Sequence, residues 1–417
     1  MISFRPSPAL QLALTQVIVE GSTFLRNLIL ARLIGAEQMG LAVAVALGIR
    51  LFEMIGDFGL ERWLVQVRSS DLGRARGTVH SLQALKGLLL TGLAVLAAVP
   101  VTKALQPQLD PAIFALAAIA IAIRGLVNCD YRERQRGRDY AATLHVEGGS
   151  SLVALFAIAP IALLTRDYSA FAWASISQAV ALCMLSHVVA RRAMSFTTEL
   201  DIVKQALRFG FPVACNAALM FLAMQGDRVL IAIYFEPEVL AAFALAAQLT
   251  LLPALAGAKY LLTFDLPRFS RLTLRPNAWQ PLFRSRLRRV AGIAATLTLV
   301  LGILGDELVG FLYGPQFVVD PAVMGLLALA AGLRLLRAVP NTLLTAMGRT
   351  TVLLACNLPR IVTLSLAFGA LAIGAGPATV VFIGALSEAA GLMMGLTAVY
   401  TSDRWQSRLS QPSPETL

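Results

Sequence analysis

About twelve apolar segments, each close to 20 residues long, divide this chain of 417 residues into a regular series. A helix needs about 20 largely apolar residues to cross the hydrocarbon core of a bilayer, so each segment predicts one transmembrane helix. Hydrophobic residues make up 57% of the chain and charged residues only 14%, well below the roughly 25% of a soluble domain. The predicted spans are residues 9–30, 38–60, 78–100, 109–128, 144–164, 170–190, 209–234, 238–262, 290–313, 321–344, 352–373 and 378–400.

The lysines and arginines outside these segments lie almost entirely in alternate gaps. One set of gaps, with both termini, holds 23 of the 35 basic residues, whereas the other set holds only Arg32, Lys103 and Arg166. Basic loops are retained in the cytoplasm, so the sequence predicts that both termini are cytoplasmic. The net charge of +11 is explained by this topology, and no nucleic-acid partner is predicted.

Nine basic residues remain inside the predicted spans. At about 2.5–3.5 kcal/mol for each charge near the bilayer centre, nine lipid-facing cations would cost on the order of 20–30 kcal/mol. We therefore expect most of them to pair with acids or to line a hydrated cavity, while Arg124, Lys259 and Arg360 are placed to reach the membrane surface from helix ends. The nine are Arg26, Arg50, Lys86, Arg124, Arg228, Lys259, Arg334, Arg337 and Arg360.

Two groups of these charges predict a site. Arg50, Glu53, Asp57 and Glu61 recur every three or four residues and would share one helix face; such a stripe forms either a cavity wall or a ladder of salt bridges. Arg334 and Arg337 also share a face with no acid nearby in sequence. That arrangement favours an anion such as phosphate as their partner, unless Glu388 or Glu147 from another helix pairs with them.

An internal repeat divides the chain into two halves. FLRNLILARLIGAEQMGLAVAVAL and GDRVLIAIYFEPEVLAAFALAAQL align at an offset of about 202 residues, which matches Arg26 with Arg228. Parallel repeats of this kind are known in transporters. The sequence predicts an all-helical fold of two six-helix bundles, residues 1–208 and 209–417, with a flexible entrance at Gly210 and Pro212 before the seventh span.

At these residues the chain resembles the polysaccharide-transporter branch of the multidrug, oligosaccharidyl-lipid and polysaccharide exporter superfamily. The resemblance rests on RNLILARLIGAEQMGL, GDFGLERWLVQ, LRFGFPV and GDRVLIAIYF, with FLYGPQF and LTAMGR in places where the family has similar turns. Ala241 and Phe243 depart from the family's Gly and Tyr, and twelve spans are fewer than the fourteen of lipid II flippases, which argues against a peptidoglycan role.

The resemblance implies a flippase of the bacterial inner membrane. It would carry an undecaprenyl-diphosphate-linked oligosaccharide for O-antigen or exopolysaccharide synthesis through a central cationic cavity that opens alternately to each side. Cavity arginines engage the diphosphate in such proteins, a role that maps onto Arg26 and Arg228; charge pattern adds Arg334, Arg337 and Arg50.

The energy source is predicted to be the membrane potential or a gradient of H⁺ or Na⁺, since no ATP-binding motif is found. Glu20, Asp57 and Asp227 are the candidates for coupling, with structural ion pairing as the alternative for each.

Two other functions remain open. An ion-coupled drug or metabolite antiporter of the same superfamily would need cavity carboxylates, whereas the candidates here are richer in arginine. A polyprenyl-linked polysaccharide polymerase or ligase would need an outer catalytic domain, for which the short outer loops leave no room. His80, His145 and His187 are scattered and the four cysteines show no metal spacing, so we predict no catalytic residue, metal or cofactor.

Overall fold

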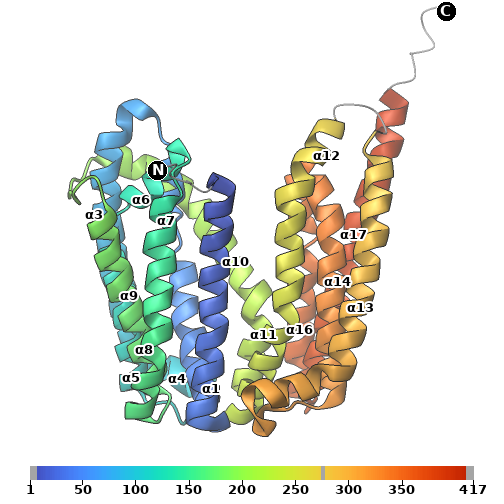
Figure 1. Cartoon of the computed structure of the whole chain (residues 1–417), viewed down its shortest axis with the longest axis horizontal. Coiled ribbons are helices and arrows are strands. Elements are labelled where there is room, and N and C mark those ends of the chain that lie inside the picture. The colour runs from blue at the N-terminus through green and yellow to red at the C-terminus, as the bar shows by residue number, and fades with distance from the viewer. Residues whose placement is uncertain (1–6, 274–277, 410–417) are drawn as a thin grey trace, which may run out of the picture. The chain divides into compact units, whose positions relative to one another are not determined.

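Helices make up all the regular structure that the computed structural model contains in the residues it describes, 7–273 and 278–409 (Figure 1). The predicted all-helical fold is thus confirmed. The first half comprises α1 (Pro8–Ile55), α2 (Leu60–Gln66), α3 (Leu72–Leu96), α4 (Ala98–Leu105), α5 (Pro111–Gly125), α6 (Asp130–Glu133), α7 (Ala141–Thr143), α8 (Gly149–Thr165) and α9 (Ser169–Val189). The second comprises α10 (Leu200–Tyr234), α11 (Pro237–Tyr260), α12 (Leu266–Leu272), α13 (Gln280–Tyr313), α14 (Pro321–Ala346), α15 (Thr350–Ala355), α16 (Leu358–Ala372) and α17 (Pro377–Leu409).

Ten helical stretches in the described residues are long and apolar enough to cross a membrane, and a bent pair, Pro111–Gly125 with Asp130–Gly137, makes an eleventh. The first stretch, Leu10–Gln66, contains two of the predicted spans. Every predicted span therefore has a helical counterpart, and the chain is a multi-pass membrane protein.

The outward faces of these helices carry large apolar side chains. Leu96 is 82% exposed, Leu164 85% and Ile373 88%. Exposure on this scale is unfavourable in water but is expected where lipid tails replace water around the helices.

The first two predicted spans are joined by a bend rather than by a loop. α1 continues through the predicted gap, and its helical geometry breaks only at Gly35, which has φ 81° and ψ 177°. Residues with a Cβ rarely adopt positive φ, so a single glycine is enough to redirect the chain between the two spans.

Gly210 and Pro212, the predicted flexible entrance, lie within the continuous helix α10 (Leu200–Tyr234). A Cβ at position 210 would lie 2.6 Å from the carbonyl oxygen of Phe58. The glycine therefore permits close packing of α10, and the proline is accommodated within the helix, as is common in membrane spans.

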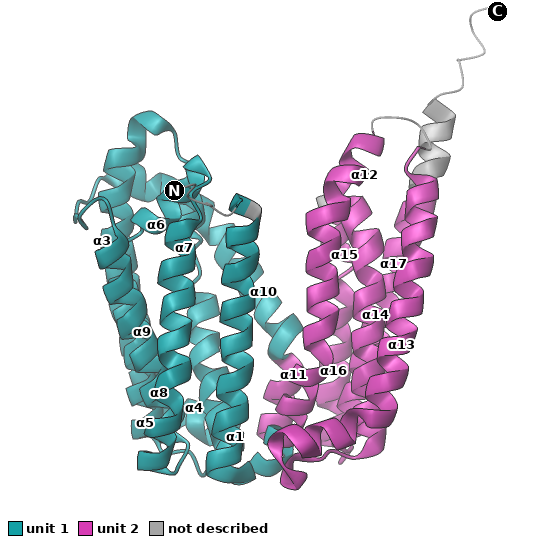
Figure 2. Ribbon diagram, viewed as in Figure 1, with its two compact units in different colours: residues 1–225, 235–241 teal, residues 226–234, 242–417 magenta. Residues whose placement is uncertain are grey.

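The chain forms two compact units (Figure 2). Unit 1 comprises residues 1–225 and 235–241, and unit 2 comprises 226–234 and 242–417; α10 and α11 thus contribute residues to both. Within unit 1, α5 contacts α3 and α9, and α8 contacts α1 and α9. Within unit 2, α14 contacts α13 and α17, and α17 also contacts α16.

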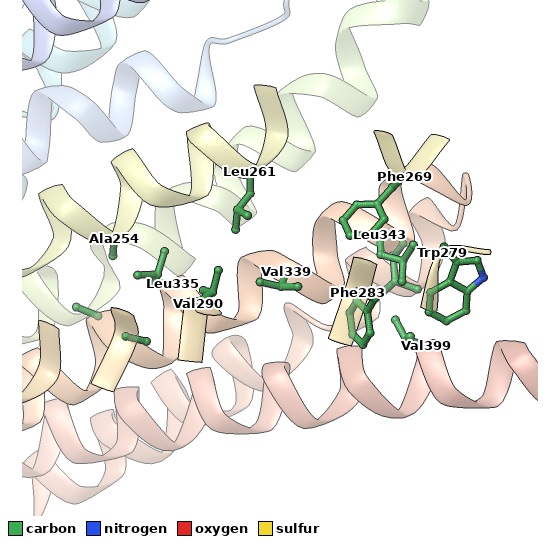
Figure 3. Packing of buried hydrophobic residues seen from close by; sticks show 13 residues of the cluster. Ala254, Leu261, Phe269, Trp279, Phe283, Val290, Leu335, Val339, Leu343 and Val399 are labelled. Carbon is green, nitrogen blue, oxygen red and sulfur yellow. The ribbon is translucent and has the colours of Figure 1, made fainter. Parts of the chain in front are cut away.

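The core of unit 2 is built along one face of α14. Leu335, Val339 and Leu343 are spaced four residues apart and are all buried, so they form a continuous apolar stripe. Trp279 and Phe283 pack edge to face beside it with ring centroids 5.9 Å apart (Figure 3).

The basic gaps of unit 1 are tied together by ion pairs. Arg76 contacts Glu133 at 2.7 Å, and Arg134 contacts Asp139 at 2.7 Å. Arg136 donates to the carbonyl oxygen of Val67 (2.7 Å) just after the end of α2, where helix carbonyls lack internal donors. Arg74 hydrogen-bonds Glu199 and lowers the pKa of that carboxyl.

Candidate functional site

A cavity of about 490 Å³ lies inside unit 1. Its walls come from α1, α3, α5, α8 and α9, together with the segment around α6. Four basic side chains and four carboxylates line it: Arg50, Lys86, Arg124 and Arg132, with Glu53, Asp57, Glu61 and Glu147. A second cavity, of about 310 Å³, shares Asp57, Glu61, Gln83, Lys86 and Arg132 with the first.

The predicted stripe of Arg50, Glu53, Asp57 and Glu61 does line this cavity. It does not lie on one helix, however, because α1 ends at Ile55 and α2 begins after Gly59, which has φ 60°. The Asp57 carboxylate accepts a hydrogen bond from the Gly59 N–H at 3.0 Å and so stabilises the turn between the two helices.

Ion pairs connect the cavity walls. Glu53 contacts Arg50 at 3.5 Å and also contacts Arg124 of α5. Arg132 bridges two carboxylates, Glu61 at 2.8 Å and Glu147 at 2.6 Å. The stripe is therefore both a cavity wall and part of a salt-bridge ladder, and the expectation that Arg124 reaches the membrane surface is wrong.

A π-helical turn, Leu144–Gly148, brings Glu147 to this wall. The turn precedes α8, and the hydroxyls of Ser150 and Ser151 donate to the Glu147 carbonyl oxygen at 3.0 and 2.8 Å. Short π-helical turns of this kind are frequent at functional sites. The site prediction from sequence did not include Glu147 or Arg132, because their contacts depend on how separate helices pack.

Lys86 differs from the three cavity arginines. Among the side chains that the structure describes, no carboxylate lies within 4.0 Å of its ammonium group, although it lines both cavities. Sequence reasoning placed Lys86 among the charges inside the spans but not among the site residues.

Arg26 lies beside the same cavity. Its guanidinium donates to the side-chain oxygen of Gln178 at 2.8 Å, and Gln178 lines the cavity. Among the side chains that the structure describes, Arg26 forms no salt bridge. Arg228, which the repeat aligns with Arg26, lies in unit 2 next to Asp227.

Arg334 and Arg337 are already paired with a carboxylate of the protein. Both contact the buried carboxylate of Glu388 on α17, Arg337 at 3.2 Å, and Arg337 also donates to Asn357 at 2.8 Å. The premise of unpaired cations was therefore wrong, because helix packing supplies an acid more than 50 residues away in sequence.

The proposed coupling acids also have partners. Asp227 contacts Arg360 at 2.6 Å, and Arg360 is buried rather than extended to the membrane surface as expected. Asp57 contacts Arg62 at 3.1 Å, and Glu20 accepts a hydrogen bond from Gln16 at 2.7 Å. For Asp227 and Asp57 these contacts are the structural ion pairs that the sequence left open as the alternative; the contact of Glu20 is a hydrogen bond with a neutral amide.

The fold and this charged cavity define a polytopic membrane protein with a polar chamber inside one of its helical units. The chain belongs to a family described as polysaccharide biosynthesis proteins, whose model matches residues 29–320. No curated protein sequence matches the chain.

Solved transporters share the fold. An inward-facing multidrug resistance transporter of the MATE family, in the MOP superfamily, gives a TM-score of 0.72 at 13% identity, covering 97% of this chain and 100% of its own. The lipid II flippase MurJ in an inward closed conformation gives 0.73 at 11% identity, with coverages of 93% and 87%. At such low identity the similarity establishes the fold alone.

Proposed function

We propose that this protein moves an undecaprenyl-diphosphate-linked oligosaccharide from the cytoplasmic to the periplasmic leaflet of a bacterial inner membrane, by alternating access, for O-antigen or exopolysaccharide synthesis. Membership of a polysaccharide biosynthesis family and a fold shared with a lipid flippase support it. A diphosphate cannot enter a low-dielectric core unless cations compensate its charge.

The observation that carries the proposal is that two cations at the unit 1 cavity, Arg26 and Lys86, have no carboxylate partner among the described side chains. Its lining holds four basic groups and four carboxylates, and Arg26, which donates to Gln178, adds a cation whose one partner among the described side chains is this amide. Lys86 contacts no carboxylate among the described residues. An anionic head group is the ligand whose charge complements these two cations. The sugars of the substrate would lie in the hydrated part of the chamber.

A second candidate is an ion-coupled drug or metabolite antiporter. The specific observation in its favour is the set of four cavity carboxylates, Glu53, Asp57, Glu61 and Glu147, more acid than the sequence suggested. Three of them, Glu53, Glu61 and Glu147, are in contact with cavity arginines, and Asp57 contacts Arg62. A cationic drug would have to displace these partners, so the flippase is the better account.

Deleting the gene separates these functions. A flippase predicts that lipid-linked repeat units accumulate on the cytoplasmic leaflet, whereas a polymerase or ligase predicts accumulation on the outer leaflet. Normal surface polysaccharide in the deletion strain, together with increased sensitivity to cationic dyes, would instead favour the antiporter.

Complementing the deletion strain with variants tests the site. Arg26→Gln should reduce polysaccharide export about tenfold or more, the size expected when one charge-assisted contact is lost. Arg191→Gln is the matched control, because Arg191 is 70% exposed and lies outside the cavity; it should export normally. Export by well-expressed Arg26→Gln at the control level would exclude Arg26 from the site.

A further inference from the structure

The two units contain a second repeat that is clearer than the first. Residues 110–124 and 320–334 both begin Asp-Pro-Ala and both have arginine fourteen positions after the aspartate, at an offset of 210 residues. Asp110 caps α5 by accepting from the Ala112 N–H at 2.8 Å, and Asp320 caps α14 by accepting from the Ala322 N–H at 2.7 Å. α5 and α14 are therefore equivalent helices, and Arg124 corresponds to Arg334.

The same offset relates α9 to α17. Ser-Gln-Ala at 177–179 aligns with Ser-Glu-Ala at 387–389, so Gln178 corresponds to Glu388. The packing agrees, since α5 contacts α9 in unit 1 and α14 contacts α17 in unit 2. With the repeat that matches Arg26 with Arg228, each unit has a set of three equivalent positions. The set is Arg26, Arg124 and Gln178 in unit 1, and Arg228, Arg334 and Glu388 in unit 2.

These two sets differ in charge at one position. In unit 2 the Glu388 carboxylate contacts Arg334 and Arg337. In unit 1 the corresponding Gln178 supplies only a neutral amide oxygen, which accepts from Arg26. A hydrogen bond to a neutral acceptor is roughly half as strong as one to a carboxylate, so Arg26 can exchange this partner for an anion more readily than Arg334 can leave Glu388.

Gln178 is also exposed to the cavity. Its side chain lines the 490 Å³ cavity, together with Lys86 and Arg124. An anion in the cavity would therefore meet a neutral amide with a guanidinium directly behind it. A carboxylate at the same position would pair with Arg26 and repel the anion.

We infer that Gln178 is the specificity-determining residue of the unit 1 site: its neutrality, where the equivalent position of unit 2 has Glu388, leaves Arg26 available to bind a phosphate group of the substrate. This inference rests on the proposed function. It assigns phosphate recognition to unit 1 and a structural role to Arg334 of unit 2, the equivalent of Arg124.

The test measures binding of undecaprenyl diphosphate to the full-length protein in detergent, with undecaprenol as the uncharged reference lipid. Gln178→Glu should weaken undecaprenyl diphosphate binding about tenfold or more, as expected for losing one charge-assisted contact, and should leave undecaprenol binding unchanged. Gln178→Met, which has a similar length and no charge, should stay within about threefold of the original protein, because a methylene-scale change in packing leaves the charge of Arg26 in place.

Each outcome is decisive. If the original protein prefers the diphosphate and Gln178→Glu retains that preference, the inference is wrong while the proposed function stands. If Gln178→Met loses as much affinity as Gln178→Glu, shape rather than neutrality matters and the inference is again overturned. If the original protein shows no preference for the diphosphate over undecaprenol, the proposed function fails and the inference fails with it.

Discussion

Individual charges in this protein are stabilised by partners on other helices. Arg132 shows the principle, since it bridges Glu61 and Glu147 and lies 5.2 Å from the centroid of the Tyr131 ring. This ionic group is partly buried, and removing one member of such a group leaves the remaining charges uncompensated.

Arg132→Met should therefore lower the free energy of unfolding by about 3 kcal/mol, because two carboxylates would then face each other across the cavity. Thermal unfolding in detergent measures the effect. The control is Arg191→Met, whose side chain is 70% exposed and whose loss should cost less than about 1 kcal/mol. Adding Glu147→Gln to the Arg132 variant should recover part of the loss; equal stability of the two single variants would contradict a structural bridge.

At this scale the sequence predicts which residues are charged inside the spans but not their partners. The stripe of Arg50, Glu53, Asp57 and Glu61 was identified from spacing alone and does line the cavity, although its residues do not share one helix as the spacing predicted. The pairing of Arg334 with Glu388 was named only as an alternative, because it depends on the packing of α14 against α17. The correspondence of Gln178 with Glu388 was visible in the sequence at an offset of 210 residues and could have been found there.

Helices of unit 1 approach closely where glycine removes the side chain. A Cβ at Gly40 of α1 would lie 1.8 Å from the carbonyl oxygen of Pro237, at the start of α11. Backbone cannot yield as a flexible side chain can, so the two segments require glycine at this position.

Gly40→Ala should destabilise the protein by about 2 kcal/mol or more, a cost typical of overpacking. Gly21→Ala on the same helix is the matched control, because nothing lies within 4 Å of a Cβ there. Alanine is the better helix former by about 1 kcal/mol, so the control should be neutral or stabilising. Thermal unfolding of both variants gives the comparison, and a Gly40 variant as stable as the Gly21 variant would refute the close approach.

Element boundaries were the least predictable feature at this scale. The spans follow from apolar length, which is a composition signal. The bend at Gly35, the continuous helix through Pro212 and the π-helical turn before α8 leave no trace in that signal. Gly35 offered a signal, since glycine is the residue that adopts positive φ without strain.

For the whole molecule, the alternating basic gaps predict the membrane orientation. Arg138 lies in a gap of the basic-rich set and Gln108 in a gap of the basic-poor set, and both residues are exposed. The positive-inside rule therefore predicts that Arg138 is cytoplasmic and that Gln108 lies on the outer side. Since α5 and the bent segment after it are the stretch that separates these two sites, labelling them also tests whether this bent pair crosses the membrane.

We expect Gln108→Cys to react with a membrane-impermeant maleimide in intact cells and Arg138→Cys to react only after the membrane is opened. The background must lack Cys129, Cys183, Cys215 and Cys356, all of which are free thiols. Labelling of both new cysteines from the same side would mean that the bent pair enters and leaves by one face, which would invert the orientation of every later span. Labelling of Arg138→Cys alone in intact cells would reverse the predicted topology and with it the assignment of the termini to the cytoplasm.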